Sequence, residues 1–155
     1  MASITPFLWF DDNAEEAIDF YSSIFPDAKL GRATRQNGKF FVGDFELAGQ
    51  KFTAINGGPQ FKFTEAISLY VNCKDQAEVD RYWDSLLAGG GTPQQCGWLK
   101  DRFGLSWQII PEALPRLMSD PDPRKAERVT RAMLQMVKID IARLEAAYRG
   151  ESIPA

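Results

Sequence analysis

The sequence predicts an α+β protein made of two β-α-β-β-β modules, at about residues 4–58 and 66–112 of a paired region that spans 1–112. Two observations predict this class. Each module has an apolar strand-like segment, a polar cap and an amphipathic helical pattern in that order. Similar blocks then recur in the same order in both halves, which indicates an internal duplication. A C-terminal helical extension is expected at 113–150, with a tail at 151–155.

The first module begins with the apolar, aromatic segment 4–10, which is typical of a buried strand. The polar stretch 11–13 supplies residues that cap helices. Apolar residues at helical spacing then predict a helix that ends before Pro26. Three strands are expected near 29–35, 39–47 and 50–56, and Asn37-Gly38 predicts a tight hairpin turn between the first two.

The second module repeats this order. Residues 66–71 form an apolar strand pattern, and a cap region precedes an amphipathic helix over 76–88 that three glycines terminate. Strands are expected near 94–100 and 105–110.

The two halves align in three blocks. The first strands match at an offset of 61 residues, the helices at 62 and the last strands at 55. Because neither half can bury both faces of its own sheet, each should pack against the other or against a partner.

After Pro111, the pattern Pro121-Asp122-Pro123 predicts the start of a helix that continues without a breaker to about Tyr148. Its apolar residues follow a narrow seam at steps of three and four. Two interpretations stay open: the helix docks on its own domain, or it clasps a second subunit.

Composition excludes several functions. The chain has no histidine, so Ser-His-Asp catalysis, Cys-His catalysis and His-ligated zinc are excluded. A net charge of −3 argues against a nucleic-acid partner, and no apolar run is long enough for a membrane span. Two cysteines and the absence of a signal-peptide pattern lead us to expect a cytoplasmic protein.

Several stretches carry a family resemblance. They are PFLWF (6–10), FY (20–21), NGGP (56–59), EVD (78–80), CGW (96–98) and GLSWQ (104–108), with the helical sequence 128–140. Together with the duplicated modules they resemble the vicinal oxygen chelate superfamily of glyoxalases, bleomycin-resistance proteins and extradiol dioxygenases. More narrowly they are similar to its PhnB-like branch, which carries the label 3-demethylubiquinone-9 3-methyltransferase. The resemblance implies that the modules form a curved, mixed-sheet half-barrel.

In metal-dependent relatives, the first and last strands of each module present His or Glu to a central divalent ion. The resemblance places those positions at Thr5, Thr53, Ala66 and Gln108, where this chain has no such ligand. Hydroxyl, methyl and amide groups are poor ligands for these ions. We therefore expect neither a metal nor another cofactor, and no glyoxalase or dioxygenase chemistry.

Other chemistry has weak support. No glycine-rich turn joins a strand to a helix, so no S-adenosylmethionine site is evident. Cys73 is a weak candidate nucleophile, because it precedes a helix and neighbours Lys74, and an inert thiol is the alternative. Whether Cys73 or Cys96 is reactive stays open.

These observations predict a homodimeric, metal-free protein that binds a small molecule of unknown identity. The alternatives are an enzyme with a mechanism of its own and a structural partner protein. Aromatic residues on the strands together with convergent polar groups could form a ligand pocket, and an aromatic-rich core is the alternative interpretation. The expected pocket residues are Thr5, Trp9, Thr53, Asn56, Ser68, Tyr70, Trp107 and Gln108.

Overall fold

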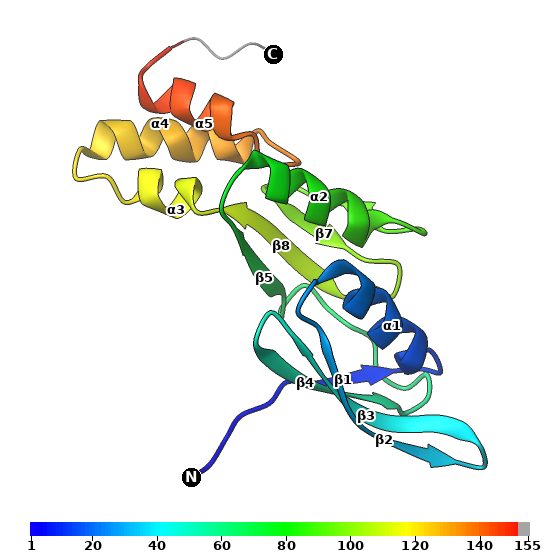
Figure 1. Ribbon diagram of the computed structural model, residues 1–155. Helices are drawn as coiled ribbons and strands as arrows, with labels where there is room; N and C mark the ends of the chain where they lie inside the picture. The colour runs from blue at the N-terminus through cyan, green and yellow to red at the C-terminus, as the bar shows by residue number, and fades with distance from the viewer. Residues whose placement is uncertain (152–155) are drawn as a thin grey trace. The chain divides into compact units, whose positions relative to one another are not determined.

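The computed structural model describes residues 1–151 and divides into two compact units, Met1–Phe63 and Thr64–Ala155 (Figure 1). Residues 152–155 of the expected tail lie outside the described residues. The first unit contains β1 (Phe7–Phe10), α1 (Ala14–Ile24), β2 (Lys29–Gln36), β3 (Lys39–Leu47) and β4 (Gln50–Asn56). The second contains β5 (Leu69–Cys73), α2 (Gln76–Leu87), β6 (Thr92–Pro93), β7 (Trp98–Lys100), β8 (Ser106–Pro111), α3 (Ala113–Met118), α4 (Pro123–Leu134) and α5 (Ile141–Tyr148).

The first unit is a four-stranded sheet in the order β1-β4-β3-β2, in which β1 is parallel to β4 and the other pairs are antiparallel. One face is covered by α1, whose Tyr21 ring stacks on Phe45 at 6.4 Å, and Phe45 stacks on Phe52 at 5.2 Å. Asn37 and Gly38 both have positive φ, at 52° and 77°, as the predicted hairpin turn requires.

The second unit repeats this topology, with the order β5-β8-β7-β6 and a parallel β5–β8 pair. A reciprocal cap begins α2: the Asp75 carboxylate accepts from the Glu78 backbone N–H at 2.9 Å, and Glu78 Oε1 accepts from the Lys74 N–H at 2.8 Å. The predicted α+β class and paired modules are confirmed.

The strand registers correct the predicted alignment of the first strands. Phe7 pairs with Thr53 in the first unit, and Tyr70 pairs with Gln108 in the second. With the last strands aligned at an offset of 55, the first strands therefore align at 63, and the predicted 61 was wrong. A shift of two residues leaves the alternation of inner and outer side chains unchanged, so the sequence pattern could not reveal it. The counterpart of Thr5 is thus Ser68 rather than Ala66.

A single long C-terminal helix was also predicted, and this is wrong. The chain forms α4 and α5, separated by residues 135–140. The backbone carbonyls of Met136 and Val137 accept from the N–H groups of Cys96 and Gly97, both at 2.8 Å. These bonds, with burial of Met136 and Ile139, outweigh continuation of the helix.

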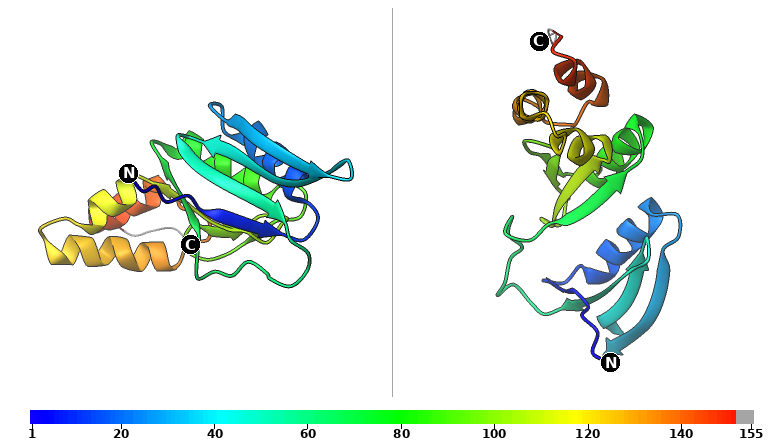
Figure 2. Two further views of the ribbon diagram at one scale, coloured as in Figure 1. Left: turned by 90° about the horizontal axis from the view of Figure 1, so that it is seen from below. Right: turned by 90° about the vertical axis from the view of Figure 1, so that its left-hand side faces the viewer.

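The three C-terminal helices pack side by side in both views of Figure 2 and share a core with the end of β8. That core contains Ile110, Leu114, Leu117, Val129, Ala132, Met136, Ile139, Leu144 and Ala147. The predicted seam is interrupted, because Leu144 is buried while Leu134 and Val137 are 55% and 41% exposed. The extension packs on its own module, as the first of the two interpretations states, and the clasp onto a second subunit stays a prediction. Among the described residues, no helix has the length and apolarity that a membrane span requires.

Candidate functional site

A cavity of about 520 Å³ in the first unit contains two of the predicted site residues, Thr5 and Thr53. It lies at β2, β3 and β4, and its remaining lining residues are Lys29, Leu30, Gly31, Arg32, Asp44, Phe45, Glu46, Lys51 and Phe52. The Thr53 hydroxyl donates to Asp44 Oδ1 at 2.8 Å, and its backbone N–H donates to the Pro6 carbonyl at 3.0 Å. Parallel pairing of β4 with the β1 segment thus brings these two threonines to one cavity.

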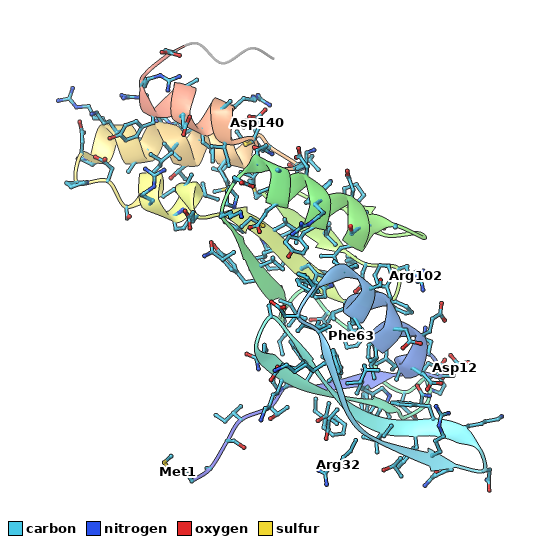
Figure 3. All side chains as sticks on the ribbon, in the orientation of Figure 1. Met1, Asp12, Arg32, Phe63, Arg102 and Asp140 are labelled. Carbon is cyan, nitrogen blue, oxygen red and sulfur yellow. The ribbon has the colours of Figure 1, made fainter. Side chains whose placement is uncertain are left out.

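The charges of this cavity form cross-strand pairs. Lys29 lies 3.5 Å from Glu46, and Arg32, labelled in Figure 3, lies 3.7 Å from Asp44. Both cationic side chains are largely exposed, so these ion pairs contribute little to stability. The lining therefore combines exposed charged side chains with the apolar side chains of Leu30, Phe45 and Phe52.

A second cavity, of about 470 Å³, lies within the second unit and differs in chemistry. It includes the predicted residues Tyr70 and Gln108. Ten residues line it, none of them charged: Tyr70, Cys96, Trp98, Gln108, Ile110, Leu114, Pro115, Met118, Ser119 and Met133. Strands β5, β7 and β8 supply one side, and α3 and α4 supply another.

Polar groups in this second cavity are few. Gln108 Nε2 donates to Ser68 Oγ at 2.9 Å, which fixes the amide plane, and within residues 1–151 the Gln108 amide oxygen accepts no hydrogen bond. Burial raises the pKa of the Tyr70 phenol above its ordinary value, and Cys73 adds to the effect. Tyr70 is therefore a protonated hydrogen-bond donor at neutral pH.

Three predicted site residues have hydrogen-bond partners within the protein. Trp9 Nε1 donates to the Gly58 carbonyl at 2.9 Å, and Asn56 Oδ1 accepts from the Ala14 N–H at 2.8 Å, which holds the start of α1. Trp107 is 2% exposed, and its Nε1 donates to Asp101 Oδ2 at 2.9 Å. The two cavities described above do not include Trp9, Asn56, Ser68 or Trp107 among their lining residues.

Sequence reasoning missed the side chains that the extension contributes. Leu114 and Met118 from α3 and Met133 from α4 line the cavity of the second unit. The sequence offered one signal for this contribution, which is that α3 follows β8 closely. A helix that starts two residues after a strand must lie beside the end of that strand. Trp98 also lines this cavity, and the CGW stretch in which it lies gave no sign of that role.

Burial argues against activation of Cys73. Its side chain is fully buried, and burial together with Glu78 raises its pKa to about 12. A thiol in this state is protonated at neutral pH and is a poor nucleophile. Cys96, in contrast, is half-buried and lines the cavity of the second unit.

The metal positions of the fold do not fit a divalent ion. Thr5 and Thr53 in the first unit correspond by register to Ser68 and Gln108 in the second, so three hydroxyls and an amide occupy the four places. Thr53 and Gln108 already donate to side chains, to Asp44 and Ser68. No group of three or more His, Cys, Asp or Glu within residues 1–151 could hold a metal.

Comparison with known proteins agrees with this architecture. The sequence family described as 3-demethylubiquinone-9 3-methyltransferase matches residues 2–110. A putative 3-demethylubiquinone-9 3-methyltransferase (PhnB protein) from Bacillus cereus is 32% identical, with a TM-score of 0.66, and the match covers 71% of this chain and 99% of that one. No curated protein matches.

Two more distant structures show the fold alone. A glyoxylase/bleomycin resistance protein/dioxygenase domain from Frankia is 13% identical, with a TM-score of 0.50 over 72% of this chain and 92% of that one. A fosfomycin resistance protein from Listeria monocytogenes, solved with Mn(II) and sulfate, is 17% identical, with a TM-score of 0.51 over 68% and 86%. The chain has the glyoxalase/bleomycin-resistance fold and belongs to the family described as 3-demethylubiquinone-9 3-methyltransferase.

Proposed function

We propose that this protein binds an uncharged small molecule with a planar ring in the cavity of its second unit, and that it does so without a metal ion. The observation that carries the proposal is the lining of that cavity, in which none of the ten residues is charged. Such a lining offers a charged ligand no ion-pair partner. An uncharged ligand needs none.

Size and composition support the same class. A volume of about 470 Å³ lies in the range of about 300–1,000 Å³ that is usual for small-molecule sites. Tyr70 and Trp98 provide aromatic surfaces, and two methionines provide adaptable apolar surface. The Gln108 amide and the Tyr70 hydroxyl are the groups that would orient a ring carbonyl or hydroxyl.

Binding can be tested with two neutral probes, N-phenyl-1-naphthylamine by its fluorescence and duroquinone by quenching of tryptophan fluorescence. Duroquinone is chosen because the family description names a ubiquinone-type compound, and its full substitution prevents alkylation of Cys96. We expect saturable binding at one site per chain. Gln108→Leu should weaken duroquinone about tenfold, the effect of one lost hydrogen bond, whereas Gln60→Leu on an exposed loop should not. Non-saturable binding, or an equal effect of both variants, would refute the proposal.

Native mass spectrometry of the purified protein tests the remaining parts. We expect a dimer mass without bound metal. The expectation of a dimer is supported by large apolar side chains that are exposed on the sheets, among them Phe7 at 59% and Leu30 at 66%. A stoichiometric divalent ion would refute the metal-free proposal, and a monomer at micromolar concentration would refute the dimer.

The alternative is an enzyme, for which the family description suggests methyl transfer. Gly57 and Gly58 follow β4 but precede a segment without a helix, and Gly89–Gly91 precede β6. Neither has the strand–turn–helix order of a nucleotide cradle. We therefore expect S-adenosylmethionine to leave the Tm unchanged, and a clear rise in Tm would favour the enzyme.

A further inference from the structure

The C-terminal extension supplies half of the lining of the second cavity. Leu114, Pro115, Met118, Ser119 and Met133 are five of its ten lining residues, and all of them follow residue 110, where the match to the family ends. The family's paired modules therefore do not by themselves provide this side of the cavity.

Helix α3 contributes side chains both to the cavity and to the core, and Leu114 belongs to both. Leu114 and Met118 lie at positions i and i+4, which share one helix face, and both line the cavity together with the adjacent Pro115. Leu117 is buried in the core with α4 and α5. Helix α3 thus attaches the extension to the core and also forms one wall of the cavity.

Hydrogen bonds hold this wall in place. Arg128 on α4 donates from Nε to the Ala147 carbonyl at 2.9 Å and from Nη2 to the Tyr148 carbonyl at 2.8 Å. The Tyr148 hydroxyl donates to Asp120 Oδ2 at 2.8 Å, in the connection between α3 and α4. The three helices are therefore tied to one another, and a fixed wall can discriminate by size.

We propose that α3 and α4 form the specificity-determining wall of this cavity, and that Met118 and Met133 set the largest ring system that it accepts. The inference rests on the proposed function of the second cavity. Both methionines are partly buried against the helical core and also face the cavity, so they have support on one side and the ligand on the other. Their thioether side chains pack well against aromatic rings, and their truncation enlarges the site without adding charge.

The test compares two neutral dyes of different size, N-phenyl-1-naphthylamine and the larger Nile red. Met118→Ala and Met133→Ala should each shift the ratio of the two Kd values at least fivefold in favour of Nile red. Leu134→Ala is the matched control, because Leu134 neighbours Met133 on α4 but is 55% exposed and does not line the cavity. Its ratio should equal that of the wild-type protein, and Met118→Leu should preserve it too.

The outcomes separate this inference from the proposed function. If wild-type protein binds neither dye saturably and no dye slows labelling of Cys96, the proposed function fails. If wild-type protein binds both dyes but the ratio is the same in all variants, the wall is not selective and only this inference is overturned. Should an alanine variant fail to fold, Met118→Phe tests the inference in the opposite direction. Nile red should then weaken at least fivefold relative to the smaller dye, and an unchanged ratio overturns the inference.

Discussion

The indole Nε1 of Trp107 donates to Oδ2 of Asp101 at 2.9 Å, and both side chains are buried. Asp101 Oδ1 also accepts from the backbone N–H groups of Phe103 and Leu105, at 2.8 and 3.1 Å. One carboxylate therefore organises the turn between β7 and β8 and fixes the tryptophan in the core. This arrangement gives Trp107 a structural role.

Asp101→Ala should lower the free energy of unfolding by about 2–4 kcal/mol, because three donors lose their acceptor in a buried place. Chemical denaturation measures the change. Asp84→Ala, on the exposed face of α2, is the control and should change stability by less than about 0.5 kcal/mol. Folded Asp101→Ala should still bind the dye. Complete loss of dye binding would indicate that Trp107 contributes to the ligand site.

The two thiols should differ in reactivity. At pH 8 we expect rapid reaction of one thiol per folded chain with an aromatic disulfide reagent, and reaction of the second only after denaturation. Burial of Cys73 and its pKa of about 12 reduce its thiolate fraction about a thousandfold relative to an ordinary cysteine. Cys96→Ser should abolish the rapid reaction. Rapid labelling of Cys73 in that variant would contradict the structure and favour the enzyme alternative.

Alkaline pH should destabilise the protein through Cys73. Its folded pKa is raised to about 12, so its contribution to stability is complete below the ordinary cysteine pKa of about 8.5–9. Above that pH the unfolded chain loses the proton and the folded chain keeps it, so stability falls by at most about 1.4 kcal/mol per pH unit up to the folded pKa. The difference in unfolding free energy between wild-type protein and Cys73→Ala, measured from pH 8 to 10.5, should shrink. A constant difference would show that the thiol does not titrate in this way.

Gln76 at the start of α2 should stabilise the C-terminal segment. Its Nε2 donates to the Ile139 carbonyl at 3.0 Å, and its Oε1 accepts from the Ile141 N–H at 2.8 Å. Gln76→Ala should cost about 1–3 kcal/mol, because both backbone groups lose their partner. Hydrogen exchange should speed up at α5, which Asp140 caps (Figure 3). Ala77→Ser, one residue along α2 and exposed, is the control; equal exchange in the two variants would contradict the role of Gln76.

Removal of residues 123–155 should destabilise the second unit. Six residues of its hydrophobic core lie beyond residue 123, among them Val129, Ile139 and Leu144. We expect a fall in Tm of more than 10 °C, or aggregation of the truncated chain, followed by thermal unfolding and light scattering. An unchanged Tm would show that the extension does not stabilise its own module.

The duplicated modules were predictable because each element depends mainly on local signals. A tight hairpin turn requires positive φ at its two central residues, which Asn37-Gly38 adopts readily, and the apolar spacing of α1 specifies its buried face. The absence of His or Glu at the fold's metal positions also follows from the sequence, because it depends on residue types.

The tertiary structure decided what local signals leave ambiguous. A two-residue shift of the first strand preserves side-chain alternation, so only the pairing of Tyr70 with Gln108 identifies Ser68 as the counterpart of Thr5. Residues 135–140 contain no helix breaker, and α4 ends there because of hydrogen bonds to Cys96 and Gly97 and the burial of Met136 and Ile139. Sequence periodicity is a property of one segment, whereas register, helix breaks and the α3–α4 side of the cavity depend on contacts between segments far apart in the chain.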